Sequence, residues 1–240
     1  FNDALDLMMG VKARDQETDQ FPQMPHVFYM PHLPYRTFYP KEYLPWMESL
    51  EDATDTIERE LSGLLSKSHG QFKPYVHSGL DKAPADDGGL LDSDSWTSAY
   101  LWNDGEPEPE VMVACPETAR LMESLPLTHI KGFSPSVLFS KLNAGATIAP
   151  HTGMINARLI CHLPLVVPPS CGLRVGEDER DVVRGEAWAF DDSINHEAWN
   201  RSDEDRIILL FDVWRPELNE DERMLISTLL GAVKQYRTST

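Results

Sequence analysis

Short hydrophobic runs separated by turn residues dominate the second half of the chain. They begin after Phe133 and predict strands at 134–142, 146–150, 157–167, 172–176, 182–190 and 206–214. Several short strands at such even spacing are typical of an all-β sandwich or a jelly roll. We therefore expect a mainly β core with the jelly-roll topology, also called a double-stranded β-helix, at about 133–216.

A helix is predicted on the N-terminal side of this core. Ser49 and Asp52 resemble a capping pair, and the apolar residues near them recur at spacings of three and four. We expect this apolar stripe to pack on a sheet. Its members are Leu50, Ile57, Leu61, Leu64 and Leu65.

Two further helices are expected to flank the core. Pro116 suits the first turn of a short helix that begins after Cys115. Another helix is predicted at 219–236, with one apolar face packed against the outside of the jelly roll. That face would contain Met224, Leu225, Leu229, Leu230, Val233 and Tyr236.

The remaining segments suggest the domain organisation. Residues 1–25 are interpreted as a linker, with the end of an upstream helical region at its start, and residues 26–240 as a single domain. The stretch 69–94 has little periodicity and is long for an inert connection. Two interpretations stay open for it: a loop or lid at an active site, and a merely mobile excursion. A strand is predicted at 95–102.

Composition narrows the classes of function. The chain has 240 residues, of which 41% are hydrophobic, and this suffices for one domain of jelly-roll size. Its net charge of −18 repels phosphate backbones and anionic lipid, so nucleic acid and membrane surfaces are not expected partners. A small or peptidic substrate fits better. Whether the charge attracts cationic substrates or only maintains solubility stays open.

Cysteine usage and hydropathy indicate the compartment. Cys115, Cys161 and Cys171 are an odd number without CxxC spacing, which argues against a disulfide framework or a zinc knuckle. A reducing compartment, the cytoplasm, is expected. No apolar run is long enough for a membrane span, and the first residues lack the features of a signal peptide. Because the chain begins at Phe1, an address label upstream of it is a further expectation.

Two histidines beside predicted strands are the main candidates for metal ligands. His151 precedes the run 157–167, and His196 precedes the run 206–214. Imidazoles held by rigid strands can share one metal ion. An iron(II) site that also binds an organic co-substrate and O2 needs few protein ligands and several open positions, which two histidines and at most one carboxylate provide.

Arg206 is the candidate for binding an anion. It begins the largely apolar run 206–214, so its guanidinium is expected to be buried. A buried Arg needs a partner, and its planar fork matches a carboxylate. An anionic co-substrate such as 2-oxoglutarate would be this partner; the alternative is an edge-strand cation over an acidic surface.

Four sequence blocks follow one another in the second half of the chain. They are HTGMINARLICHLPL at 151–165, CGLRVG at 171–176, FDDSINHEAWN at 190–200 and DVWRPEL at 212–218. In this order they resemble the aspartyl/asparaginyl β-hydroxylase family of iron(II)- and 2-oxoglutarate-dependent dioxygenases. Weaker similarity, at Ser95-Trp96, Leu101-Trp102 and 29–61, extends the resemblance over most of the chain.

The resemblance implies a cupin-like jelly roll with a metal centre. It implies that His151 and His196 hold Fe(II) and form the catalytic centre, with 2-oxoglutarate and O2 as co-substrates. Gly153 stands where many dioxygenases of this chemistry have a metal-binding Asp, and the family is similar in placing a water there. Asp191 and Asp192 are interpreted as residues that orient His196 or cap its turn.

The resemblance also implies roles around the metal. Ser140 and Arg206 would hold the far carboxylate of 2-oxoglutarate, and His162 its carboxylate near the metal. The ordinary alternatives are a solvent-facing serine and a core hydrogen bond. Arg158 is a candidate for substrate binding, because alternation along the strand places it on the same face as His162.

One position departs from the family pattern. Members with peptide substrates can have Arg-Leu-Arg before the strand histidine, whereas this chain has Arg158-Leu159-Ile160. Ile160 cannot bind a carboxylate, so the substrate stays open between a peptide, a protein and an amino-acid-like molecule.

The expected function is hydroxylation of a C–H bond, at the β-carbon of Asp or Asn, by a single oxygenase domain at 26–240. Two alternatives remain. A halogenase would use the same iron site and admit chloride at the position left by Gly153. A cupin-like module would bind metal and 2-oxoglutarate without turnover, and production of succinate would distinguish it from both enzymes.

Overall fold

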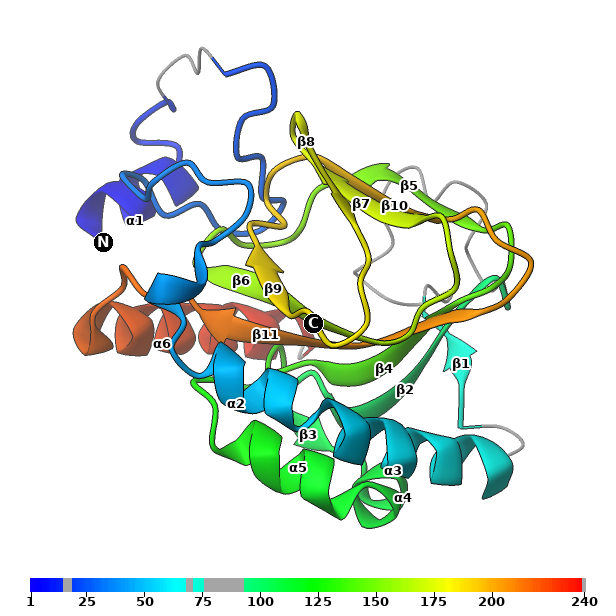
Figure 1. Cartoon of the computed structure of the whole chain (residues 1–240). Coiled ribbons are helices and arrows are strands. Elements are labelled where there is room, and N and C mark those ends of the chain that lie inside the picture. Colours follow the sequence, from blue (N-terminus) through cyan, green and yellow to red (C-terminus); the bar gives the residue numbers. More distant parts are fainter. Residues whose placement is uncertain (15–18, 68–70, 76–92, 239–240) are drawn as a thin grey trace.

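Two antiparallel sheets face each other in the second half of the chain, and helices cover the outside of the larger sheet (Figure 1). The computed structural model describes residues 1–14, 19–67, 71–75 and 93–238. Side chains of both sheets, such as Phe190 of the larger one and Leu173 of the smaller one, share one buried cluster. The candidate site residues lie around this inner layer.

The strand order of both sheets is that of a jelly roll. The large sheet has the order β1 (Lys73–Pro74), β2 (Trp96–Asn103), β4 (Val137–Leu142), β11 (Arg206–Trp214), β6 (Arg158–Val166) and β9 (Trp188–Phe190), and β3 (Glu106–Pro107) pairs with β2. The small sheet has the order β5 (Thr147–His151), β10 (His196–Asn200), β7 (Cys171–Val175) and β8 (Asp178–Asp181). From β4 onward the chain passes back and forth between the sheets. The mainly β, jelly-roll prediction is confirmed.

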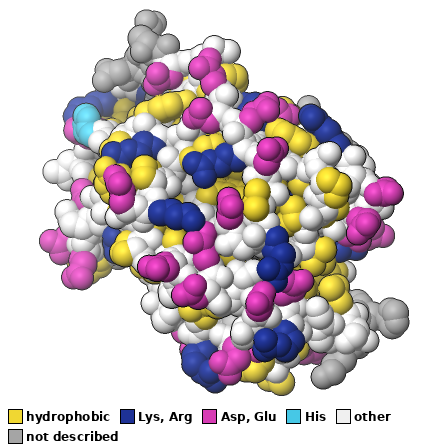
Figure 2. Space-filling model, viewed as in Figure 1, with side chains coloured by type: hydrophobic (Ala, Val, Ile, Leu, Met, Phe, Trp, Pro, Cys, Tyr) yellow, Lys and Arg dark blue, Asp and Glu magenta, His cyan; other side chains and the backbone are white. Residues whose placement is uncertain are grey.

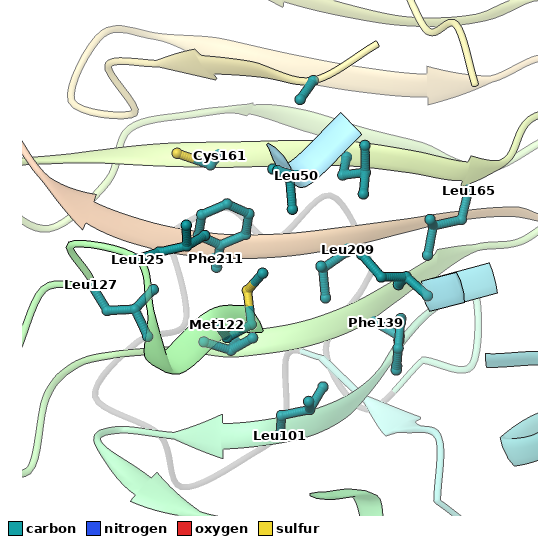
Figure 3. Close-up of a cluster of buried hydrophobic side chains, with 14 of the residues drawn as sticks. Leu50, Leu101, Met122, Leu125, Leu127, Phe139, Cys161, Leu165, Leu209 and Phe211 are labelled. Carbon is teal, nitrogen blue, oxygen red and sulfur yellow. The ribbon is translucent and has the colours of Figure 1, made fainter. Parts of the chain in front are cut away.

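Alternation along the central strands gives the large sheet two different faces. Leu209 and Phe211 of β11 face the helices, together with Phe139 of β4 and Cys161 of β6 (Figure 3). The helices over this face are α2 (Met47–Asp52), α3 (Thr54–Lys67), α4 (Pro109–Ala114) and α5 (Pro116–Glu123). The intervening strand residues, which include His162, therefore face the small sheet.

Most of the predicted strands are present. The runs at 134–142, 146–150, 157–167, 172–176 and 206–214 are confirmed as β4, β5, β6, β7 and β11, and 95–102 as β2. The single strand predicted at 182–190 is wrong, because the chain forms β8, turns through Gly185 at a φ of 76° and returns as β9. β10 is not predicted, because its inward positions include the polar His196 and Asn200, which break the hydrophobic alternation.

The helix predicted from Ser49 begins earlier and is interrupted at Ala53, between α2 and α3. Ser49 does not cap a helix, since its hydroxyl donates to the carbonyl of Trp46 at 2.8 Å from inside α2. The apolar stripe packs on the large sheet as predicted, except for Leu65, which is exposed. The short helix after Cys115 is confirmed as α5, and α4 precedes it without having been predicted.

The predicted C-terminal helix is confirmed as α6 (Glu220–Thr238), but the predicted face is only partly right, since Leu229 and Leu230 pack on the core and other members do not. Ile226 and Leu230 are buried with Trp214 in one cluster. The exposed members of the predicted face are Met224, Leu225 and Tyr236. At about 100° per residue, Met224 lies roughly 200° around the helix axis from the buried Ile226, so the two residues cannot share a face. Within the described residues, no helix is both long and apolar enough to cross a membrane.

The segment before the jelly roll lies against the loops that carry the candidate site. The amide of Met24 donates to the carbonyl of Ser193 at 2.6 Å, and the amide of His26 donates to the carbonyl of Gly153 at 3.1 Å. Gln23, within the predicted linker, is buried. The helix α1 (Asn2–Met8) and the 3-10 helix at Lys41–Tyr43 belong to this segment. Most of the predicted lid loop, residues 76–92, lies outside the described residues.

A buried ion pair fixes the loop before His196. Arg215 is fully buried, and its Nη1 donates to Asp191 Oδ2 at 2.8 Å. We expect Arg215→Met to lower the free energy of unfolding by about 3–5 kcal/mol, because Asp191 would be left buried without its cation. The matched control is Arg184→Met, whose side chain is 47% exposed beside Asp55 and Glu58, and which should cost about 0–1 kcal/mol. Equal effects in urea denaturation would contradict this assignment.

Candidate metal centre

The two candidate ligands lie opposite each other on neighbouring strands of the small sheet. His151 ends β5, His196 begins β10, and the two residues are cross-strand partners. Their ring centroids are 4.1 Å apart, with an interplanar angle of 52°. The jelly roll thus brings together the two histidines predicted from the sequence.

Backbone contacts orient both imidazoles in the same way. The Nδ1 of His151 lies 2.8 Å from the carbonyl of Ala149, and the Nδ1 of His196 lies 2.9 Å from the carbonyl of Ile194. A carbonyl accepts only, so each Nδ1 carries a proton and each Nε2 has a free lone pair. Burial lowers the pKa of both rings, and for His196 the neighbouring His151 adds to this effect. Neutral imidazoles with free Nε2 atoms are suited to a shared divalent metal.

Gly153 leaves space that a neighbouring carboxylate occupies. A Cβ atom at Gly153 would overlap Asp192, with Oδ1 at 2.8 Å and Oδ2 closer still. Asp191 instead caps its turn, since its Oδ1 accepts from the amide of Ser193 at 3.0 Å. In the part of the chain that the structure describes, no group of three His, Cys, Asp or Glu side chains is arranged to hold a metal. Among the described residues, the candidate centre therefore consists of two imidazoles.

His162, on the large sheet, is connected to the histidine pair through the ring of Phe190. Phe190 lies between the sheets, with its centroid 5.2 Å from His196 and 5.1 Å from His162. Burial, followed by the charge of Arg206, lowers the pKa of His162 well below its usual value. His162 is thus a neutral group between the histidine pair and Arg206.

The positive charge of Arg206 is buried, and no described residue pairs with it. Only 2% of the residue is exposed, and among the described residues its guanidinium has no ion-pair or hydrogen-bond partner. Burial lowers its pKa to about 10, so it remains charged at neutral pH. The indole Nε1 of Trp188, whose ring is 5.7 Å from that of His162, is another buried donor to which no described residue offers an acceptor. Unpaired donors around a buried cation are what an anionic ligand requires.

Ser140 lies on the same face of the sheet as Arg206. Ser140 pairs with Ile208 on β11, two residues from Arg206, and its hydroxyl accepts from Trp96 Nε1 at 3.0 Å. Trp96 in turn stacks on Tyr75, with centroids 4.0 Å apart. Neither Trp96 nor Tyr75 was predicted from the sequence to belong to the site. Trp96 and Ser98 are two residues apart on β2 and so lie on the same face, and Ser98 pairs with Ser140 on the inner face.

Arg158 is also on the inner face, but it is shared between two carboxylates. Its Nη1 lies 3.3 Å from Asp212 Oδ2, and its Nη2 lies 3.5 Å from Asp192 Oδ2. Burial raises the pKa of Asp192 to about 7, with Arg158 opposing the shift. Ile160, the next inward residue of β6, is buried in the apolar cluster between the sheets.

The other histidines divide into two groups. His26, which seemed unremarkable in sequence, lies beside the centre because its Nε2 is 3.1 Å from Thr152 Oγ1. His32 and His129 lie away from it, and His69 and His77 are outside the described residues. The position of His26 near the centre follows only from the contact of the N-terminal segment with the loop after His151. No local sequence pattern predicts that contact.

We expect Gly153→Ala to disturb the centre, because its Cβ would displace the Asp192 carboxylate and the turn after His151. Metal affinity should fall about 10- to 100-fold, as for other changes to groups that orient metal ligands. The double variant with Asp192→Ala removes the overlapping carboxylate and should recover part of the loss. Unchanged affinity in the single variant would show that the turn accommodates a side chain.

Several curated proteins resemble the chain at moderate identity. Human aspartyl/asparaginyl β-hydroxylase is 31% identical over 189 residues, covering 77% of this chain and 23% of that protein. Aspartate β-hydroxylase domain-containing protein 2 of Xenopus tropicalis is 27% identical, covering 92% of this chain and 59% of that protein. The chain therefore spans less than two thirds of either relative.

Solved structures with a similar arrangement are cupin domains. The cupin domain of Schizosaccharomyces pombe Cnp3 has a TM-score of 0.34 at 10% identity, over 51% of this chain and 66% of that chain. A cupin domain protein from Salinispora arenicola has a TM-score of 0.34 at 10% identity, over 57% and 86% of the two chains. Likeness at this level supports no conclusion about the function of this chain or the details of its fold.

A protein-family model also matches the chain. The sequence model of the Aspartyl/Asparaginyl beta-hydroxylase family covers residues 51–216, from α2 to the residue pair after β11. The matched range includes both histidines of the centre and the buried Arg206. This match, over more than half of the sequence, shows that the chain belongs to the aspartyl/asparaginyl β-hydroxylase family.

Proposed function

We propose that the protein is an iron(II)- and 2-oxoglutarate-dependent dioxygenase that hydroxylates a C–H bond of its substrate. One observation carries the proposal: two imidazoles with free Nε2 atoms share the inner layer with a buried guanidinium that has no partner among the described residues. A metal needs the first feature, and an anionic co-substrate needs the second.

His151 and His196 would hold the iron through their Nε2 atoms. When bound, the iron supplies the activation of O2 that no amino-acid side chain provides. Two protein ligands leave the remaining positions for co-substrate and O2. The backbone carbonyls of Ala149 and Ile194 keep each ring in the required tautomer, 2.8 and 2.9 Å from the two Nδ1 atoms.

Arg206 would bind the far carboxylate of 2-oxoglutarate. Ser140 would assist it, with a hydroxyl already oriented by Trp96, and His162 would donate to the carboxylate near the metal. Binding of this dianion compensates the buried charge of Arg206, which otherwise destabilises the fold. Phe190 and Ile160, both buried, keep water away from the reacting groups.

The overall reaction balances without further reagents. The substrate C–H, 2-oxoglutarate and O2 give the substrate C–OH, succinate and CO2, with one oxygen atom in the alcohol and the other in succinate. The family name points to the β-carbon of Asp or Asn, and a peptide or protein is the proposed substrate.

The chain's free, buried cysteines agree with a reducing compartment, and we propose the cytoplasm. Acidic and basic side chains are interspersed over the face in Figure 2, and we propose no nucleic acid or membrane partner.

The halogenase alternative is disfavoured by Asp192. Its carboxyl group fills the space beside Gly153 where chloride would have to bind. The test supplies iron, 2-oxoglutarate, O2 and pooled peptides, with and without chloride, and follows succinate and product mass. We expect succinate and the gain of one oxygen under both conditions. A chlorinated product would establish the halogenase, and binding without succinate would establish a non-catalytic module.

A further inference from the structure

Arg158 and Asp192 each retain one polar atom without a partner. Asp212, the other carboxylate at Arg158, is fully satisfied, because the hydroxyl of Ser134 and the amide of Ser136, at 2.6 Å, also donate to it. By contrast, Asp192 Oδ1 and Arg158 Nε are buried and have no hydrogen-bond partner among the described residues. A buried acceptor and a buried donor are costly unless a ligand satisfies them.

This pair adjoins the metal centre. The Asp192 carboxylate lies against Gly153, two residues after His151. Arg158 lies on the same face of β6 as His162, with Ile160 between them. Arg158 is 9% exposed and Asp192 is 5% exposed, so both residues are almost completely buried. A substrate whose C–H bond lies near the metal would meet both.

The charges around Arg158 do not suit an anion. One guanidinium faces two carboxylates, and Ile160 contributes no second cation. A carboxylate ligand can only accept hydrogen bonds, so it brings no donor to Asp192 Oδ1, and the two carboxyl groups could pair only if one of them took up a proton. A carboxamide has both an acceptor and two donors. It could accept from Arg158 Nε and donate to Asp192 Oδ1, the two atoms of this ion pair that no described residue satisfies.

We propose that Arg158 and Asp192 bind a carboxamide of the substrate, so that the enzyme hydroxylates asparagine residues in preference to aspartate residues. This inference rests on the proposed dioxygenase function. It assigns Asp192 a role in specificity. It also accounts for the apolar residue at position 160, because Ile160 does not provide the second positive charge that a carboxylate substrate would require.

The test uses two degenerate peptide pools that differ only in an Asn or an Asp at the central position. Protein loaded with iron and 2-oxoglutarate is given both pools, and the fraction that gains one oxygen is measured for each. Binding is measured separately by titration of the pools into protein loaded with Mn(II) and 2-oxoglutarate, where no turnover occurs. We expect at least a tenfold preference for the Asn pool in both measurements.

Two variants locate the cause of the preference. Asp192→Asn replaces the acceptor-only carboxylate by an amide, and Ile160→Arg adds a cation; each should shift the Asn-to-Asp ratio at least fivefold toward Asp. Asp181→Asn, on the exposed hairpin strand β8, is the matched control and should leave the ratio unchanged. Circular dichroism verifies folding, and Ile160→Lys replaces Ile160→Arg if the latter does not fold.

The outcomes separate this inference from the function on which it rests. Equal or better use of the Asp pool by the native protein overturns the carboxamide assignment, as does a ratio that neither Asp192→Asn nor the change at Ile160 moves. Succinate formation with neither pool hydroxylated or bound also overturns it. Failure to bind iron and 2-oxoglutarate at all would instead contradict the dioxygenase function.

Discussion

Replacement of either His151 or His196 by alanine is expected to abolish iron binding and reduce turnover of 2-oxoglutarate below detection. The described part of the centre offers two imidazoles and no third side-chain ligand, so the loss of one leaves a single protein ligand. One imidazole cannot both retain the metal and fix its orientation. Equilibrium dialysis with Fe(II), followed by a succinate assay, measures both effects.

The control for these variants is His129→Ala, because His129 is exposed and lies outside the centre. It should bind iron and turn over 2-oxoglutarate like the native protein. Stoichiometric iron and near-native succinate formation in either His151→Ala or His196→Ala would refute the assignment of that residue as a ligand.

Replacement of Arg206 by lysine should raise the KM for 2-oxoglutarate roughly 10- to 100-fold while iron binding is retained. The ammonium keeps the charge but loses the planar fork that donates two parallel hydrogen bonds. A hydrogen bond to a charged group is worth about 1.5–3 kcal/mol, which corresponds to this change in affinity. Steady-state succinate formation at varied 2-oxoglutarate measures it, and an unchanged KM would place the anchor elsewhere.

A stability measurement distinguishes this arginine from Arg215. Arg206 has no partner among the described residues, whereas Arg215 is paired with Asp191 at 2.8 Å. Without 2-oxoglutarate, Arg206→Met should therefore leave the free energy of unfolding unchanged or raise it, because it removes an uncompensated buried charge. The stabilisation that 2-oxoglutarate gives the native protein should disappear. A large loss of stability in Arg206→Met would indicate a structural role instead.

Strands are predicted best from the sequence where no functional polar residue interrupts their hydrophobic periodicity. β6 and β11 are buried central strands, and their apolar runs are found close to the predicted bounds. β10 carries His196 and Asn200 at inward positions, so its pattern resembles a loop until its partners β5 and β7 are known. The polar side chain of the proposed metal ligand therefore conceals the strand that carries it from a prediction based on hydrophobic alternation.

Contacts between distant segments are the part of the site that sequence reasoning could not supply. The spacing of His151 and His196 does not show that they are cross-strand partners, which follows only from the pairing of β5 with β10. The packing of Asp192 on Gly153 likewise depends on two loops of the small sheet. The long-range neighbours of Arg158 gave no local signal, although alternation placed its side chain on the correct face.

Binding stoichiometry under anaerobic conditions, followed by exposure to O2, tests the dioxygenase function most directly. The native protein should bind one Fe(II) and one 2-oxoglutarate per chain, and on admission of O2 together with the Asn-containing peptide pool it should form succinate, CO2 and hydroxylated peptide in equal amounts. His196→Ala should do neither, and Arg206→Met should bind iron alone. Iron-independent binding of 2-oxoglutarate without any succinate, or iron bound equally well by His196→Ala, would contradict the proposed centre.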